Sequence, residues 1–183
     1  RFPLANVRGA FHRSNVSWYL PPEARTGDTE PRLGGRSWVS ADVDLGEETL
    51  RVVSLHFESR IAAFTTQVDQ ATELAELAAA SPLPVLVAGD TNAPTYTGAV
   101  FDGDAALGRA DDATIAALLD AGLVDAHAGL EPELRPTRSG LVIDLLLGKD
   151  VTFSDAQVCP EATCAGLSDH QPIWADVDLG GAR

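Results

Sequence analysis

Positive charge is scarce in this sequence. Lys and Arg number 13 against 27 Asp and Glu, which gives a formal net charge of −14, and Lys149 is the single lysine. Such an excess of negative charge repels polyanions at long range and disfavours loose electrostatic adhesion to nucleic acid. It remains compatible with a local phosphate site, and with carboxylates that converge on a divalent cation.

Methionine is absent, and so is any long apolar run. Because the chain opens on Arg1 without a methionine, we expect it to be a processed or truncated form of a longer product. No apolar stretch approaches the roughly 20 residues that a membrane-spanning helix needs. The 183 residues, 45% of them hydrophobic, suit one globular domain. We therefore expect a single domain over residues 1–183, without a transmembrane segment, and a monomer.

Cysteine is limited to Cys159 and Cys164. Their spacing is compatible with a small disulfide loop, although sequence does not fix the geometry that a disulfide requires. A metal-binding pair is the alternative, but a structural zinc site needs a second pair or flanking histidines. A disulfide would favour an exported, extracellular protein.

Alternation of apolar and polar residues predicts several strands. Residues 37–45 and 50–57 alternate on either side of Gly46, which predicts a hairpin of antiparallel strands. Residues 84–88 form a short apolar strand, and a polar loop is expected from Gly89 to about Gly108. We also expect strands at residues 5–11, 141–147, 151–158 and 171–179. A loop is expected at residues 21–35, and the last three strands are expected to be separated by turns that contain Gly148 and the cysteine loop.

Two segments have helical spacing. The first begins after a cap at Ser59 and ends before Ser81, and the second is capped by Asp111 or Asp112 and is stopped by Gly122. Strands predominate, and the two helices are spaced too irregularly for a regular βαβ array. The pattern therefore favours an α/β (α+β) sandwich of sheets flanked by helices over a doubly wound sheet.

One carboxylate interrupts an otherwise apolar strand. Asp144 lies within Leu-Val-Ile-Asp-Leu-Leu-Leu at residues 141–147. Burial of an unpaired carboxylate is strongly unfavourable, so Asp144 needs a cationic or hydrogen-bonding partner, or a place near a strand end. An ion pair that only holds the fold is one explanation, and a histidine partner would favour a functional role.

Polar motifs follow or precede other expected strands. Ser-Asp-His, with Asp169 and His170, precedes the last strand, and by itself it would be a turn. Asp90 and Asn92 follow a buried strand in Gly-Asp-Thr-Asn, where an Asx-turn is the alternative. His56 ends a strand before the first helix, a place where a lone histidine is more often structural.

Taken together, these acids, amide and imidazoles suit hydrolysis of a phosphate ester. Negative charge grows on the phosphoryl oxygens and the leaving group during attack, so a metal or imidazolium groups must face it. A carboxylate with a neighbouring amide can orient and deprotonate water. The candidate residues are His56, Asp90, Asn92, Asp144, Asp169 and His170.

The order of these motifs resembles the endonuclease/exonuclease/phosphatase superfamily, whose fold is that of deoxyribonuclease I. The resemblance begins near Arg-Phe-Pro-Leu at residues 1–4 and continues through His-x-Glu-Ser, Gly-Asp-x-Asn, Ile-Asp and Ser-Asp-His-x-Pro. It implies a four-layer α/β-sandwich, with two packed, mostly antiparallel sheets, helices outside, and the active site at one edge. It also implies that the domain lacks its N-terminal strands, because the family's early strands have no counterpart before residue 1.

The resemblance implies a role for each candidate residue. Asp90 corresponds to the residue that activates or orients water, and Asn92 to a neighbour that holds phosphate. His170 corresponds to the imidazole that contacts the scissile phosphate, oriented by Asp144, and His56 to a second phosphate-facing histidine. Asp169 corresponds to a metal ligand.

The resemblance also implies a divalent cofactor, Mg²⁺ or Mn²⁺. The family's principal metal-binding Glu has no counterpart in this chain, and Asp169 alone offers one or two oxygens where Mg²⁺ prefers six ligands. We therefore expect weak metal binding or none in this chain.

A phosphodiester or phosphomonoester hydrolase is the leading hypothesis. A noncatalytic phosphate-binding module of the same fold is the alternative, and a domain of turn formers and ion pairs is a third, which leaves Asp144 unexplained. The acidic excess favours a small or lipid phosphate ester over nucleic acid. A nucleic-acid groove would draw on Arg32, Arg36, Arg60 or Arg138. Trp18 and Tyr19 are available to stack on a base or touch lipid, although aromatic residues of this kind more often cover the core.

Overall fold

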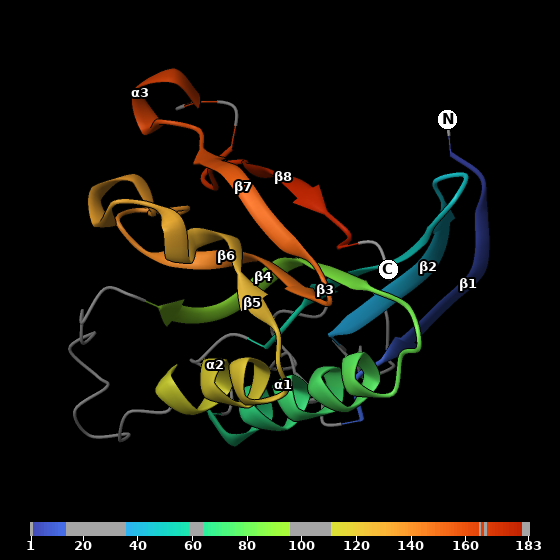
Figure 1. Cartoon of the computed structure of the whole chain (residues 1–183). Coiled ribbons are helices and arrows are strands. Elements are labelled where there is room, and N and C mark those ends of the chain that lie inside the picture. The colour runs from blue at the N-terminus through green and yellow to red at the C-terminus, as the bar shows by residue number, and fades with distance from the viewer. Residues whose placement is uncertain are drawn as a thin grey trace, which may run out of the picture.

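A six-stranded sheet is the centre of the molecule (Figure 1). The computed structural model describes residues 2–13, 36–58, 64–95, 111–164, 166 and 168–180. Within them the sheet has the order β1-β2-β3-β4-β6-β5, with β3 and β4 parallel and every other pair antiparallel. Its strands are β1 Leu4–Phe11, β2 Ser37–Asp44, β3 Thr49–His56, β4 Val85–Thr95, β5 Val124–Asp125 and β6 Val142–Lys149. The predicted hairpin is β2 and β3.

Two helices cover one face of this sheet (Figure 1). They are α1 Phe64–Ala79 and α2 Asp111–Asp120, and both match predicted helices, although Ser59 lies outside the described residues. Alternate residues of β3, β4 and β6 face the helices and form the main core. This core includes Val53, Leu55, Val85, Val87, Leu145 and Leu147 from the strands, and Ala71, Leu74, Ala78 and Leu118 from the helices.

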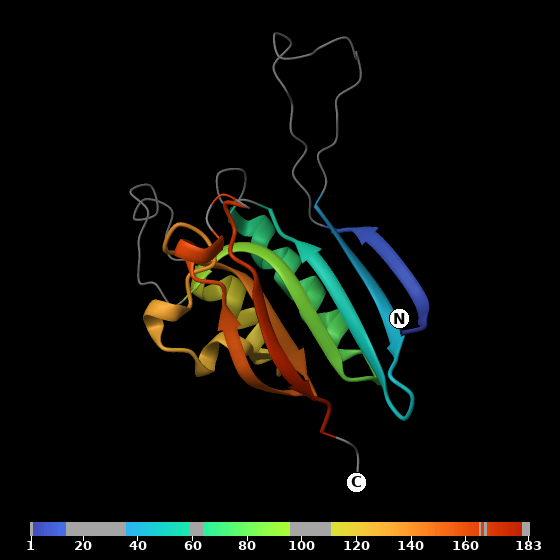
Figure 2. The same ribbon diagram turned by 90° about the horizontal axis from the view of Figure 1, so that it is seen from above.

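A second sheet packs on the opposite face (Figure 2). It consists of β7 Thr152–Val158 and β8 Ile173–Asp178, which run antiparallel. Gly148 lies inside β6, where a Cβ would collide with Val151 and approach Phe153 to 3.0 Å. The prediction that Gly148 lies in a turn is therefore wrong, because the glycine lets β7 approach the first sheet closely. The predicted α/β-sandwich of two mostly antiparallel sheets flanked by helices is confirmed.

Strand β4 is longer than predicted. It continues through residues 89–95, where a loop was expected, because its ladder with β6 pairs Asp90 with Asp144 and, after a bulge, Thr95 with Val142. Gly89 permits this path, since a Cβ there would collide with the carbonyl of Leu55. Residues 96–108 of the expected loop lie outside the described part of the chain.

Several short elements were not predicted. Strand β5 and the 3-10 helices η3 Ala126–Gly129 and η4 Pro132–Leu134 connect α2 to β6, and the short helix α3 Glu161–Cys164 replaces the expected cysteine turn. Cys159 and Cys164 form a disulfide across α3. The expected loop at 21–35 lies outside the described residues. None of the described helices is long and apolar enough to cross a bilayer.

Candidate active site

Three neighbouring strands place His56, Asp90 and Asp144 in one row across the sheet. The register pairs His56 of β3 with Asp90 of β4, and Asp90 with Asp144 of β6. Directly paired residues share a face of a sheet, and the adjacent Leu55 and Leu145 belong to the core under the helices. The row therefore lies on the face toward the second sheet.

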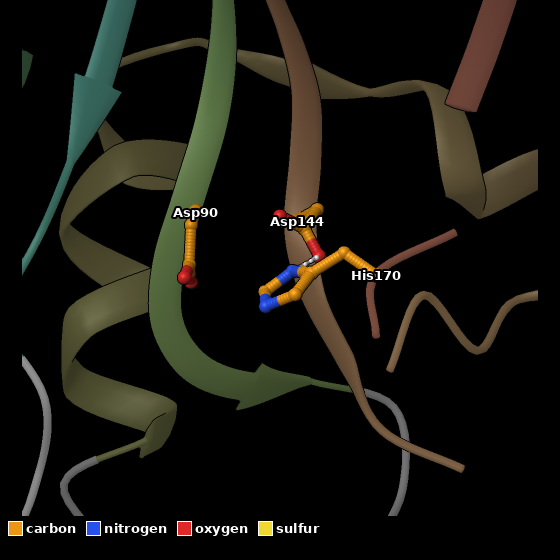
Figure 3. Close-up of side chains that lie close together, drawn as sticks. All are labelled: Asp90, Asp144 and His170. Carbon is orange, nitrogen blue, oxygen red and sulfur yellow. Dashed lines mark hydrogen bonds and ion pairs between the residues drawn. The ribbon is translucent and has the colours of Figure 1, made fainter. Parts of the chain in front are cut away.

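The imidazole of His170 completes this row. Its Nδ1 lies 2.7 Å from Oδ2 of Asp144, and Figure 3 shows the ring between Asp144 and Asp90. When Nδ1 donates to this carboxylate, Nε2 is left as the nitrogen that faces other groups. The predicted histidine partner of Asp144 is therefore present in the structure, and the pair joins β6 to the segment before β8.

Thr137 fixes the backbone on both sides of this pair. Its hydroxyl oxygen accepts hydrogen bonds from the amides of Ile143 and Asp144, each at 3.1 Å. Its carbonyl accepts from the amide of Gln171 at 2.6 Å. One residue outside every predicted motif thus positions Asp144 and His170 together. A lone threonine in a segment of mixed composition carries no sequence signal for this role.

Asp90 lies in the middle of the row. Its Oδ1 accepts from the amide of Asn92 at 2.7 Å, and its Oδ2 lies 3.3 Å from Nε2 of His56. Burial raises the pKa of Asp90, the neighbouring Asp144 raises it further, and the hydrogen bond from Asn92 partly offsets both effects. A carboxylate with a raised pKa is a stronger base once it is ionised, which suits the abstraction of a proton from water.

Asn92 is held by the backbone around it. It has a positive φ of 50°, its side-chain amide donates to the carbonyl of Phe57 at 3.1 Å, and its carbonyl accepts from Gln67 at 3.0 Å. The Asx-type hydrogen bond to Asp90 that was weighed as an alternative is also present. Asn92 therefore ties the end of β3 to β4, and its phosphate-holding role remains a prediction.

His56 is the most exposed member of the row, with 49% of its side chain accessible. Nη1 of Arg36 lies 2.9 Å from its Nε2 and 3.2 Å from its Nδ1. Burial lowers the pKa of His56, and the charge of Arg36 lowers it further against the opposing effect of Asp90. Nε of Arg36 lies 3.4 Å from the fully buried Glu58 carboxylate.

Asp169 lies apart from the row. Its side chain is 71% exposed, and its carboxylate is paired with Nη2 of Arg138 at 2.7 Å. The potential ligand atoms of Asp90, Asp144 and His170, in contrast, all lie within 4.8 Å of one another. The structure thus brings together five of the six predicted residues, counting Asn92 through its bond to Asp90, and does not bring Asp169 into this group.

Two buried glutamines of α1 support the site. Gln67 donates to the carbonyl of Glu58 at 2.6 Å and to that of Asn92 at 3.0 Å, and Gln70 accepts from the amide of Glu58 at 2.8 Å. Both are almost fully buried. Their sequence signal is a polar residue on the apolar face of the predicted helix, since Gln67 and Gln70 fall within one turn of Ala71 and Leu74.

The donor set is compatible with a divalent ion. Two carboxylates and one imidazole suit metals such as Mn²⁺, and the carboxylate oxygens suit Mg²⁺. One oxygen of Asp144 is already engaged by His170, so water would have to complete an octahedral shell. Asp90, Asp144 and His170 are the described residues that could hold such an ion.

No protein-family model and no curated protein sequence matches the chain. Solved structures do match. D. rerio TDP2, once humanized by mutation and once with a single-strand DNA product, aligns with TM-scores of 0.68 and 0.65, 17% identity in both, over 97% of this chain and 68% and 69% of those chains. The endonuclease/exonuclease/phosphatase from Bacteroides vulgatus aligns with a TM-score of 0.66, 16% identity, over 97% of this chain and 66% of that one.

The chain has the endonuclease/exonuclease/phosphatase fold. The human Nocturnin catalytic domain with bound sulfate shares it, with a TM-score of 0.60 and 14% identity over 97% of this chain. This chain spans 60% of that domain's length. The family resemblance read from the motifs is thereby confirmed as a likeness of fold.

Proposed function

We propose that this chain is a phosphoesterase that hydrolyses phosphodiester bonds by attack of an activated water, with phosphomonoesters as the alternative substrate class. The observation that carries the proposal is the row of His56, Asp90 and Asp144 on three adjacent strands, closed by His170 at 2.7 Å from Asp144. These groups come from segments far apart in the sequence. A role confined to local turns or caps does not require them to meet.

Each group has a proposed task. Asp90, held by the Asn92 amide, accepts the proton of the attacking water. His170, oriented by Asp144, donates toward the phosphoryl oxygens or the leaving group as negative charge grows there. His56, on the other side of Asp90, faces the same phosphoryl group. General-base and electrostatic contributions of this kind are each worth roughly 10²-fold or more.

A divalent ion has a defined place in this proposal. The carboxylates of Asp90 and Asp144 would hold it, with Mg²⁺ or Mn²⁺ as the ions whose chemistry fits the donors. The ion would supply Lewis-acid stabilisation of the phosphoryl oxygens. Asp169 would join these ligands only if it left Arg138.

The test is a hydrolysis assay of the purified chain on bis-p-nitrophenyl phosphate and on p-nitrophenyl phosphate, with Mg²⁺, with Mn²⁺ and with EDTA. We expect turnover of the diester that rises with the metal and is lost in Asp90→Asn. Asp176→Asn is the matched control, because it makes the same acid-to-amide change on an exposed residue of β8. Absence of turnover under all conditions, together with retained phosphate binding, would favour the noncatalytic phosphate-binding module.

A further inference from the structure

A disulfide lies directly before the segment that carries His170. Cys159 follows the end of β7, Cys164 ends α3, and their sulfurs are bonded to each other. His170 stands six positions further along the chain, shortly before β8. Because Val158 of β7 pairs with Ile173 of β8, α3 lies at the end of the second sheet where His170 is found (Figure 1). The disulfide therefore belongs to the surroundings of the candidate site.

Cys159 holds both ends of this segment. Its sulfur is bonded to Cys164 at the upstream end, and its backbone amide donates to the carbonyl of Pro172 at 2.9 Å at the downstream end. Residues 164–172 thus form a ring that is closed through Cys159, by a covalent bond on one side and a hydrogen bond on the other. His170 is part of this ring.

The upstream half of the ring has little other anchorage. A helix of four residues such as α3 is too short to be stable by itself. The ion pair of Asp169 with Arg138 is largely exposed, and exposed pairs contribute little. Of the residues from 160 to 169 whose burial the structure describes, Cys164 is buried and the others are exposed, namely Pro160, Ala162, Thr163, Gly166, Ser168 and Asp169. Within that part of the chain, the bond from Cys164 to Cys159 is therefore the strongest restraint.

The short span of the disulfide favours a local role. Disulfides that close long loops constrain the unfolded chain most, and this one joins residues five positions apart. Its restraint therefore acts mainly on α3 and the adjoining segment of the folded chain. Cys159 and Cys164 are the two cysteines of the sequence, so a thiol reagent acts on this bond alone.

We propose that the Cys159–Cys164 disulfide positions His170 against Asp144, so that the candidate site is fully assembled in the oxidised chain and loosened in the reduced one. The inference rests on the proposed function, in which His170 faces the phosphoryl group, and it adds a redox control of that site. The distance of 2.7 Å between Nδ1 of His170 and Oδ2 of Asp144 requires a fixed ring. Misplacement of a catalytic group by about 1 Å can cost roughly 10²-fold in rate.

A dithiol reductant opens the disulfide in a balanced exchange. The bond between the sulfurs of Cys159 and Cys164 breaks, each of these sulfurs ends as a thiol with a proton from the dithiol, and the two dithiol sulfurs join in a new disulfide. Cys159 is 8% exposed and Cys164 9%, so we expect reduction of the folded chain to be slow and to need an excess of the dithiol. An external disulfide such as oxidised glutathione reverses the exchange.

The first experiment measures kcat and KM on bis-p-nitrophenyl phosphate. It compares the oxidised chain, the chain reduced with dithiothreitol and then freed of it, and the double variant Cys159→Ser with Cys164→Ser. We expect kcat/KM to fall by about 10-fold or more in both altered forms, mainly through kcat, and to return when the reduced chain is reoxidised. Unchanged kcat/KM in the reduced chain would overturn the inference.

Val151→Ala is the matched control for a general loss of stability. Val151 is buried and directly precedes β7, at the opposite end of that strand from Cys159. Its truncation weakens the packing of the second sheet and leaves the ring through Cys159 intact. We expect kcat/KM of this variant to stay within about 3-fold of wild type well below its melting temperature. A loss as large as that caused by reduction would assign the disulfide a general stabilising role and overturn the inference.

A background without His170 separates positioning from other effects of the disulfide. If the disulfide acts through His170, its reduction should lower kcat/KM no further in His170→Ala, because the two changes remove the same contribution. The comparison is a double-mutant cycle on the residual activity of that variant. A reduction effect as large in His170→Ala as in the wild-type chain would contradict the assignment.

Amide hydrogen exchange tests the same restraint without turnover. The amide of His170 donates to Oγ of Ser168 at 3.1 Å, and that of Gln171 donates to the carbonyl of Thr137 at 2.6 Å. We expect both amides to exchange at least about 10-fold faster in the reduced chain, while the amides of the central strand β6 keep their rates. Equal rates for His170 and Gln171 in the two forms would refute the restraint.

The inference and the proposed function can fail separately. Turnover in the wild-type chain that reduction leaves unchanged would overturn the inference and leave the function standing. A wild-type chain without turnover would overturn the proposed function. The exchange rates of His170 and Gln171 would then decide by themselves whether the disulfide fixes the segment that carries His170.

Discussion

Two carboxylates of the six-stranded sheet differ sharply in how they are held. Asp42 belongs to β2 and is paired with Arg51, near the beginning of β3. Its carboxylate accepts hydrogen bonds from Arg51 at 2.7 and 3.0 Å and from Asn6 at 2.7 Å. Asp90 lies beside the opposite end of β3, between His56 and Asp144. The hydrogen bonds from Arg51 are the largest cause that lowers the pKa of Asp42, whereas burial and Asp144 raise the pKa of Asp90.

The opposite pKa shifts mean that ionised Asp42 stabilises the folded chain, whereas ionised Asp90 destabilises it. Asp42 has a cation and an amide, so its ionised form is favoured in the folded chain. Asp90 is kept in a place that disfavours its charge, next to a second carboxylate. Perturbed acids of this kind cluster at functional sites. The proposed active site therefore lies at the end of β3 where burial and a neighbouring carboxylate disfavour the ionised form of Asp90.

The largest expected effect concerns Asp90 in catalysis. We expect Asp90→Asn to lower kcat/KM by about 10²–10⁴-fold, because the amide cannot accept the proton of the attacking water. Asp42→Asn makes the same change at the other end of the sheet and should keep kcat/KM within about 3-fold of wild type, as expected for a site with no part in transition-state binding. Steady-state kinetics well below the melting temperature measure both. Equal losses in the two variants would remove the functional distinction between these carboxylates.

The second effect concerns His170, the histidine paired with Asp144. We expect His170→Ala to lower kcat/KM by roughly 10²–10³-fold, because the imidazole faces the charge that grows on the phosphoryl group. Asp144→Asn should also lower kcat/KM, since His170 would lose the carboxylate at 2.7 Å that orients it and the proposed ion would lose one of its two carboxylates. Circular dichroism checks that both variants are folded. Full activity in His170→Ala would contradict the assigned role.

The third effect concerns Asp42 and stability. We expect Asp42→Asn to lower the free energy of unfolding by about 1–3 kcal/mol, because hydrogen bonds to a charged group are lost and Arg51 is left without this carboxylate. The melting temperature should then fall by roughly 2–4 °C for each kcal/mol. Urea unfolding at pH 7 measures the change. A variant as stable as wild type would mean that Asp42 and Arg51 contribute no more than an exposed pair.

The sequence predicted most of the fold, and five of the six candidate residues that it singled out lie together in the structure. Hydrophobic periodicity located α1, the β2–β3 hairpin and β6, because these segments bury one regular face or both faces. The extension of β4 through residues 89–95 could not be predicted, since polar residues and a proline in a strand depend on a bulge opposite β6. A single long-range ladder thus overrode the local turn signal.

In the candidate site, too, some features could be predicted from the sequence and others could not. A carboxylate in an apolar strand predicted that Asp144 needs a partner, and His170 provides it. The position of Asp169 could not be derived, because its pairing with Arg138 depends on how the segment before β8 meets residues that precede β6. Thr137 and Gln67 act through backbone groups that only the folded chain brings to them. Local patterns identify which groups need partners, and the tertiary fold decides which partners they have.

The smallest expected effect is the pH dependence of stability, and it has opposite signs at the two ends of the sheet. The folded pKa of Asp42 is lowered, so its stabilisation is present above the ordinary carboxyl range and is lost as the pH falls through the folded value.

The folded pKa of Asp90 is raised, so the folded chain binds more protons than the unfolded chain, and stability is lost as the pH rises from the ordinary carboxyl range through the folded value. We therefore expect Asp90→Asn to gain stability relative to wild type as the pH rises from the ordinary carboxyl range towards pH 7, with a higher melting temperature at pH 7. Asp42→Asn should instead lose the most at pH 7 and approach wild type in acid. Urea unfolding at each pH measures the differences, and a constant offset between Asp90→Asn and wild type across that range would show that Asp90 titrates alike in the folded and unfolded chains.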